Sequence, residues 1–172
     1  MILSDAQIAK RVGDGSLKVE PFDGGCLTPN GLDLRIGGEA VFILPGPEYA
    51  SKKVEFSRSL ELPASSVVLL LTLERLGMPK DMVAHVNLRS TYARRGFLIP
   101  GTVVDAGYTG RLTLQVHSPP YPTSLAKGER FWHILFHESY PASRGYEGRY
   151  QNSEGVVEGN PPRRPGPGLG AP

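Results

Sequence analysis

Short apolar runs separated by turns containing glycine and proline dominate the chain after its N-terminal segment. Apolar and polar positions alternate in several runs, as at Leu112, Leu114 and Val116. A period of two residues is typical of half-buried β-strands, because successive side chains point to opposite faces of the sheet. The runs that predict strands are 17–22, 32–37, 40–44, 54–62, 66–76, 82–90, 96–105, 111–118 and 130–139.

The N-terminal segment has a different period and predicts one short amphipathic helix. Ser4 is a favourable N-cap, Ile8 and Val12 stand four positions apart, and Gly13 ends the pattern. Residues 90–97 admit a single further helical turn that begins at a serine. The pattern as a whole predicts a mainly β fold of sandwich, jelly-roll or small-barrel topology.

The C-terminal part changes in composition. From residue 154 onward proline and glycine are frequent and large apolar residues are few, so this stretch cannot form a packed core. Just before it, Tyr146, Arg149 and Tyr150 stand among glycines, which suits a mobile arm that closes on a ligand. We therefore expect a domain over 1–158 that includes this arm, and a flexible tail over 159–172.

Composition narrows the class of protein. The 172 residues suffice for one domain with a substantial core. The 19 basic and 17 acidic residues leave a net charge of +2, which gives no reason to expect a nucleic-acid partner. Cys26 is the single cysteine, which excludes an intramolecular disulfide. The longest apolar run, 67–73, is too short to cross a membrane. We expect a cytoplasmic protein without membrane contact.

A basic cluster lies between residues 87 and 97. Arg89, Ser90, Arg94 and Arg95 fall within seven positions. Arginine presents planar, permanently charged donors that match phosphate oxygens, and serine adds a hydroxyl donor. The cluster is therefore a candidate polyphosphate site, with a solvated basic turn as the alternative.

Three further features carry candidate chemistry. Asp105 follows an apolar run and precedes a glycine, so it is either a turn residue or a general base that activates water. Tyr108 either stacks on a base or a sugar, or simply packs beside the turn. Asp33 interrupts an apolar strand and needs a cationic partner, either Arg35 or the arginines of the basic cluster.

The four histidines do not predict a metal site. His133 and His137 are four positions apart, but in a strand this spacing separates them by about 13 Å, too far to share one ion.

The order of these segments resembles the superfamily of trimeric dUTPases and dCTP deaminases, across roughly residues 1–158. The N-terminal opening is similar to that of the dCTP deaminase branch, which includes archaeal-type dUTPases and bifunctional enzymes. The five segments that match superfamily motifs, in order, are NGLDLRIG, LRSTYARRG, GTVVDAGYTG, KGERFWHILF and RYQNSEG.

The resemblance implies a distorted jelly-roll with a short N-terminal helix, a homotrimer with active sites between subunits, and Mg²⁺ held chiefly by triphosphate oxygens and water. It also implies a role for each motif. Arg89, Ser90 and Arg94 bind phosphates, and Tyr108 packs against the deoxyribose. The residues expected to read the base or to cover the nucleotide are Gly101, Val104, Gln115, Tyr146, Arg149 and Tyr150.

The position that separates the two chemistries is Gln115. The deaminase branch has a proton-shuttling glutamate there, whereas an amide has no titratable proton. The expected function is therefore a dUTP diphosphatase that forms dUMP and pyrophosphate, with Asp105 activating water for attack at the α-phosphorus. The alternatives are a dCTP deaminase or bifunctional enzyme, and a nucleotide-binding jelly-roll without turnover.

Overall fold

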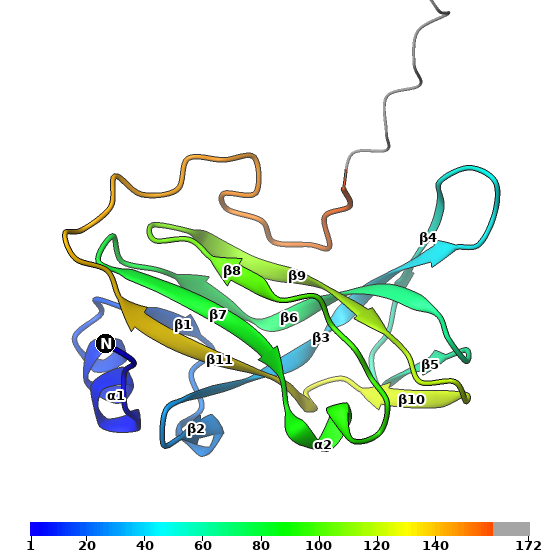
Figure 1. Cartoon of the computed structure of the whole chain (residues 1–172), viewed down its shortest axis with the longest axis horizontal. Helices are drawn as coiled ribbons and strands as arrows, with labels where there is room; N and C mark the ends of the chain where they lie inside the picture. Colours follow the sequence, from blue (N-terminus) through cyan, green and yellow to red (C-terminus); the bar gives the residue numbers. More distant parts are fainter. Residues whose placement is uncertain (160–172) are drawn as a thin grey trace, which may run out of the picture.

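The computed structural model describes residues 1–159, and strands are its main regular secondary structure (Figure 1). The N-terminal half contains α1 (Asp5–Gly13), β1 (Lys18–Glu20), η1 (Gly24–Cys26), β2 (Leu27–Thr28), β3 (Gly31–Leu44), β4 (Ala50–Glu55), β5 (Ser59–Leu62) and β6 (Val67–Gly77). The C-terminal half contains β7 (Met82–Leu88), α2 (Ser90–Ala93), β8 (Thr102–Val104), β9 (Thr109–His117), β10 (Thr123–Ala126) and β11 (Arg130–Glu138). The mainly β, jelly-roll prediction is confirmed.

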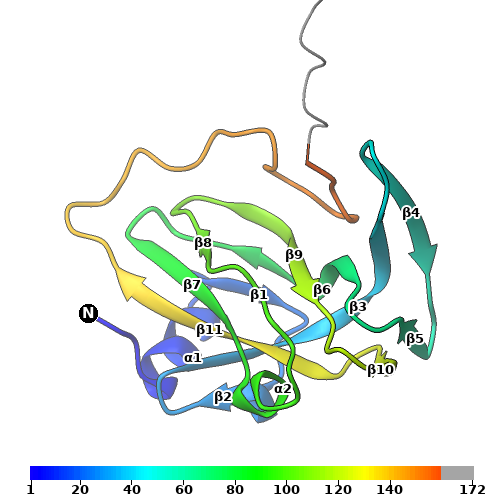
Figure 2. The ribbon, with the colours of Figure 1, turned by 45° about the vertical axis from the view of Figure 1, so that its right-hand side comes forward.

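Strand β3 connects the two curled layers of the fold (Figure 2). Its first part pairs antiparallel with β11, from Leu32 opposite Ile134 to Arg35 opposite Arg130. Its second part pairs with β6 and β4, after a change of register that follows Ile36. The two strands predicted over 32–37 and 40–44 are therefore one strand with an irregularity in the middle.

Each layer is antiparallel. In the first layer the order is β3, β11, β7 and β8, with β2 on the other side of β3. In the second layer β6 is central and pairs with β9, β3 and β1. β5 and β10 form a separate two-stranded sheet. The core contains the fully buried side chains Phe131, Trp132 and Phe136 of β11, and Phe97 from the segment between α2 and β8.

Other strand predictions also differ from the structure. The run 54–62 divides into β4 and β5, which pair with different strands, because the chain bends at the polar residues Ser57 and Arg58 between them. Of the run 96–105, only 102–104 is a strand, since Pro100 has no N–H to donate to a ladder. Strand β10 was not predicted, because its four residues are too few to establish a period.

The predicted N-terminal helix is confirmed and has a capping box. Ser4 Oγ accepts from the backbone N–H of Gln7, and Gln7 Oε1 accepts from the N–H of Ser4. The predicted single turn at Ser90 is α2, but its N-cap is Arg89 and no side chain caps it. Within residues 1–159 no helix is long and apolar enough to cross a membrane.

Candidate functional site

A turn at the end of β8 presents Asp105. The backbone N–H of Tyr108 donates to the Asp105 carbonyl at 3.1 Å, and Gly107 takes the left-handed conformation with φ of 80°. The Asp105 side chain is exposed and has no hydrogen-bond or ion-pair partner among residues 1–159. A carboxylate without a protein partner at the end of a strand is available to a ligand.

Tyr108 belongs to the core as well as to the site. Its ring is buried and makes an edge contact with Tyr146, with 5.8 Å between ring centroids. Its hydroxyl donates to the carbonyl of Arg111 at 2.8 Å, and burial raises the pKa of this phenol. The packing and the sugar-binding interpretations are therefore compatible, since a fixed ring offers a rigid surface.

A cavity of about 390 Å³ opens beside this turn, between β8, β9 and the C-terminal arm (residues 145–158). The predicted site residues that line it are Val104, Asp105, Tyr108, Gln115, Tyr146 and Tyr150. Two others do not reach it. Gly101 stands between the lining residues Pro100 and Thr102, and the Arg149 guanidinium lies over the Tyr150 ring, 4.9 Å from its centroid.

The arm is bound to its own chain, above β8 and β9 (Figures 1 and 2). Gln151 makes the central contacts. Its Oε1 accepts from the N–H of Thr109 at 2.8 Å, and its Nε2 donates to the carbonyl of Gly107 at 2.9 Å. Further along, Glu154 forms an ion pair with Arg75 at 2.7 Å. These contacts hold Tyr146 and Tyr150 against the cavity.

Two glycines allow the arm to approach this closely. A Cβ on Gly107 would lie 2.9 Å from the Cα of Gly145, and one on Gly110 would lie 2.8 Å from the backbone nitrogen of Ser153. Both glycines also have positive φ, a conformation that side chains disfavour. The glycines of this motif therefore serve the contact with the arm as well as the turn.

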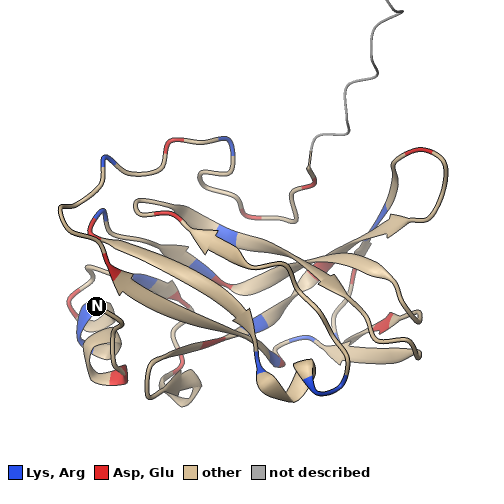
Figure 3. Ribbon diagram, viewed as in Figure 1, with Lys and Arg blue, Asp and Glu red and all other residues tan. Residues whose placement is uncertain are grey.

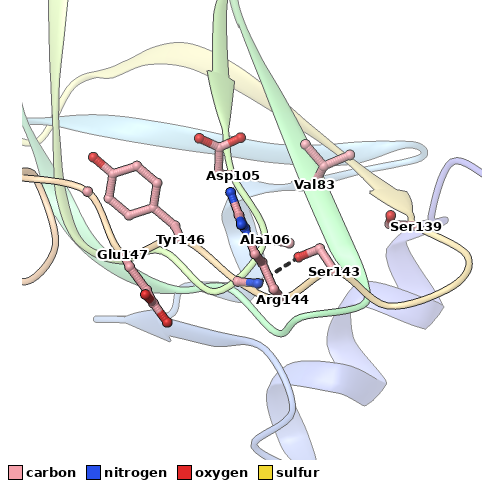
Figure 4. A pocket seen from close by; sticks show the side chains of 10 residues that line it. Val83, Asp105, Ala106, Ser139, Ser143, Arg144, Tyr146 and Glu147 are labelled. Carbon is pink, nitrogen blue, oxygen red and sulfur yellow. Dashed lines mark hydrogen bonds between the residues drawn. The ribbon is translucent and has the colours of Figure 1, made fainter.

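Asp105 also lines a second, larger and more open cavity of about 750 Å³ (Figure 4). Arg144, which directly precedes the arm, lies on its wall together with Tyr146 and Glu147 of the arm. A hydrogen bond of 3.0 Å from the N–H of Gly145 to Ser143 Oγ shapes this segment. Asp105 thus stands between two hollows and can be approached from either.

The basic cluster lies elsewhere. The Arg89 Nε donates to Asp33 Oδ2 at 2.8 Å, and His133 Nδ1 lies 3.2 Å from Asp33 Oδ1. Asp33 is 3% exposed, so its predicted need for a cationic partner is met by Arg89. Arg35, the other predicted partner, pairs instead with Glu74 at 2.6 Å. Ser90 lines a hollow of about 410 Å³ beside this ion pair.

The two predicted halves of the site are far apart within one chain. Ala84 pairs with Val104, so Asp105 lies next to Val83 at the start of β7, while Arg89 follows the end of β7. Six residues of strand separate these points by about 20 Å. In Figure 3 the basic residues around α2 lie at the lower edge of the molecule, whereas the turn after β8 lies at its upper left. None of the described cavities contains both groups.

The residues near the cavity that were not predicted include Arg111, Thr113, His117 and Gln151. Arg111 and Thr113 line the cavity, His117 contacts Gln115, and Gln151 holds the arm. The first three share the half-exposed face of β9 with Gln115, so the two-residue period of this strand contained the signal. Gln151 had no such signal, because its contacts are made by an irregular segment.

The described residues offer no ready metal cage. Among residues 1–159 there is no group of three or more histidine, cysteine, aspartate or glutamate side chains that could hold an ion. Asp105 is the only carboxylate among the described residues that line the smaller cavity. A single carboxylate fits Mg²⁺ bound mainly by phosphate oxygens and water, and does not fit a metal held by protein alone.

The fold is that of the dUTPase and dCTP deaminase superfamily, and comparison with known proteins gives the same superfamily. Residues 2–139 match the model of the dCTP deaminase-like family. The dCTP deaminase of Sulfurisphaera tokodaii is 37% identical over 166 residues, which cover 91% of each chain. The chain belongs to the dCTP deaminase-like family.

Two further similarities place the chain within this family. A probable deoxyuridine 5′-triphosphate nucleotidohydrolase of Sulfolobus islandicus rod-shaped virus 1 is 38% identical, covering 91% of this chain and 97% of the viral one. The crystal structure of a 2′-deoxycytidine 5′-triphosphate deaminase from Agrobacterium tumefaciens superposes with a TM-score of 0.67 at 28% identity. That match covers 78% of this chain and 47% of the other.

These findings correct the expected function. A dUTP diphosphatase was expected from Gln115, but the family match and several relatives at comparable identity carry the name dCTP deaminase. The expectation assumed that a proton in deamination must pass through position 115. Asp105 lines the same cavity as Gln115 and can exchange protons, so an amide at 115 does not leave the site without an acid or base.

Proposed function

We propose that the protein is a dCTP deaminase, which hydrolyses dCTP to dUTP and ammonia. The observation that carries the proposal is the position of Asp105. It is the one carboxylate among the described residues lining the cavity of about 390 Å³, it has no side-chain partner there, and Gln115 lines the same space. The cavity thus combines a carboxylate that can carry a proton with an amide that can hydrogen-bond a nucleobase.

The chain's own residues would carry the proton. In this proposal Asp105 accepts a proton from water as the oxygen bonds to C4 of cytosine, and the electron pair of the C4–N3 double bond moves to N3. The 4-amino group leaves as ammonia after receiving the proton from Asp105, and the remaining hydroxyl proton moves to N3, which gives the 4-oxo group of uracil. The overall change adds one water and releases one ammonia. Tyr108 supplies a rigid surface for the deoxyribose, and Tyr146 and Tyr150 cover the bound nucleotide and keep other water out.

The triphosphate would be held by a second copy of the chain. Arg89, Ser90 and Arg94 lie about six residues along β7 from Asp105, too far to bind phosphates next to it in the same chain. We therefore propose a homotrimer in which one copy provides the base cavity and its neighbour the phosphate-binding turn. Mg²⁺ would be held by the triphosphate oxygens and water, and when bound it neutralises part of the triphosphate charge.

The test is to incubate the protein separately with dCTP and dUTP and to measure ammonia and pyrophosphate in each. We expect ammonia from dCTP, and a loss of at least about 100-fold in this rate for Asp105→Asn, because the amide cannot exchange a proton. Glu147→Gln, a change of the same kind beside the larger cavity, should keep the rate close to that of the unchanged protein. No ammonia from dCTP would reject the proposal.

A second candidate is a bifunctional enzyme that converts dCTP to dUMP, releasing both ammonia and pyrophosphate. The viral relative named as a probable nucleotidohydrolase and the amide at Gln115 support this second candidate. The same incubation separates the two, since only the bifunctional enzyme releases pyrophosphate from dCTP.

A further inference from the structure

The orientation of Gln115 is set by a neighbour outside the cavity. Gln115 and His117 are two residues apart on β9, so both side chains lie on its half-exposed face. Gln115 lines the cavity, whereas His117 does not. The Nε2 atoms of the two side chains are 2.8 Å apart. The amide nitrogen of Gln115 therefore contacts His117, and the amide oxygen takes no part in this contact.

The chemistry of this contact determines which of the two side chains donates the hydrogen bond and which accepts it. An amide nitrogen only donates hydrogen bonds, so the Gln115 nitrogen donates and His117 Nε2 accepts. The His117 ring must then carry its proton on Nδ1. With its nitrogen engaged in this way, Gln115 has its carbonyl oxygen, an acceptor, left for the cavity.

His117 is itself held firmly at the backbone. Its N–H donates to the Leu98 carbonyl at 2.8 Å, and its carbonyl accepts from the Leu98 N–H at 3.1 Å. On the other side of β9, His117 is paired with Val67 of β6. The position from which the imidazole reaches Gln115 is therefore determined by neighbours on both sides.

We propose that His117 is a positioning residue for base recognition, acting through the Gln115 amide. Cytosine presents an amino group, a donor, at the position where uracil presents a carbonyl oxygen, an acceptor. A Gln115 oxygen facing the cavity accepts from the cytosine amino group. If the amide turns by half a rotation, its nitrogen faces the cavity and donates to the uracil oxygen. The partner at position 117 thus decides between cytosine and uracil.

The inference rests on the proposed function in that it takes a cytosine or uracil nucleotide as the ligand of this cavity. It is tested by binding, so that turnover is not needed. The full-length protein carries Asp105→Asn throughout, and calorimetry measures the dissociation constants of dCTP and dUTP, with chromatography to verify that each nucleotide is recovered unchanged. Because both nucleotides carry the same triphosphate, their affinity ratio cancels any general effect of charge.

Three substitutions at position 117 should each change the ratio of the dCTP and dUTP affinities in a different way. His117→Glu offers only an acceptor, which keeps the Gln115 nitrogen turned away from the cavity and preserves or increases the preference for dCTP. His117→Lys offers only donors, which draws the Gln115 oxygen away and shifts the ratio toward dUTP by about ten-fold. His117→Leu offers neither, so that both orientations are open and the ratio should fall between the other two.

The matched control repeats the Glu and Lys substitutions in a Gln115→Leu background, where no amide remains to turn. There the two variants should have the same ratio, which isolates the coupling between the two positions. The inference would be overturned if the affinity ratio moved in the same direction in the Glu and Lys variants, or if opposite shifts persisted with Gln115→Leu. It would also be overturned if neither dCTP nor dUTP bound. If the protein with Asp105 releases ammonia from dCTP but the affinity ratios do not shift, only the inference about His117 is rejected. If the affinity ratios shift but the protein with Asp105 releases no ammonia, only the proposed deamination is rejected.

Discussion

At the scale of single residues, Asp33 shows how the basic turn that begins at Arg89 is fixed to the core. Its carboxylate is almost completely buried, and it contacts Arg89 and His133 directly, with Arg130 Nε 4.0 Å away. A buried charge that loses its partner is costly, because neither water nor another ion replaces the lost interaction. Arg89 is therefore needed for folding as well as being expected to bind phosphate.

We predict that Arg89→Ala lowers the free energy of unfolding by about 3 kcal/mol, since it leaves Asp33 with only His133 and the more distant Arg130. Urea denaturation without nucleotide, at one fixed protein concentration, measures this change. Arg94→Ala is the matched control. The Arg94 side chain has no hydrogen bond or ion pair with the rest of residues 1–159, so its loss should cost less than about 0.5 kcal/mol. Equal losses in the two variants would show that the buried pair contributes little.

At the scale of elements, the C-terminal arm is held by its contacts with the turn after β8. Gln151 bonds to the backbone of both Gly107 and Thr109, and the N–H of Asn152 donates to the Thr109 carbonyl at 2.6 Å. These bonds join the arm to the turn that presents Asp105. The arm and the turn therefore act as one structural unit.

Gln151→Ala should loosen this unit, because the backbone groups of Gly107 and Thr109 lose their side-chain partner. We expect hydrogen exchange of amides in 146–157, and of the Thr109 and Arg111 amides that donate to the arm, to become roughly ten-fold faster, while exchange in β6 and in β9 from residue 112 onward stays unchanged. Glu147→Ala, on the same arm but without a hydrogen bond or ion pair within residues 1–159, should leave exchange unaltered. Faster exchange in both variants would argue that the arm is not held by Gln151.

The alternating strands and the capped helix could be predicted, because burial on one face imposes a local period. The bend within β3 could not, since it depends on pairing with β11 before Ile36 and with β6 after it. The same holds for the site. Asp105 and Gln115 were recognisable as chemical groups, but the contact of Gln115 with His117 required knowing how the amide turns. The tail predicted over 159–172 lies, beyond residue 159, outside the described residues.

At the scale of the whole molecule, the separation of Asp105 from the basic turn along β7 makes a single copy insufficient for the proposed reaction. The cavity beside Asp105 and the hollow beside Ser90 share no lining residue. In the proposed homotrimer, activity therefore requires contact between copies of the chain, and mixed oligomers test this requirement.

Two inactive variants should complement each other. We predict that Asp105→Asn and Arg94→Ala are each nearly inactive toward dCTP, and that mixed oligomers, formed by co-expression, recover about a quarter of the unchanged rate. A quarter is expected because half of the sites take Asp105, and half take Arg94, from an intact copy. Each variant expressed alone is the control. No recovery in oligomers verified as mixed would place both groups of one site in one chain.

The passage of β3 through both layers has a mechanical consequence. Since fourteen consecutive residues belong to the two layers in turn, pulling one layer open strains the hydrogen bonds of the other through an unbroken backbone. The layers therefore lose their order together, and partial opening is confined to segments outside β3, such as the arm. The arm can therefore loosen over the cavity without weakening the strands that form the cavity's walls.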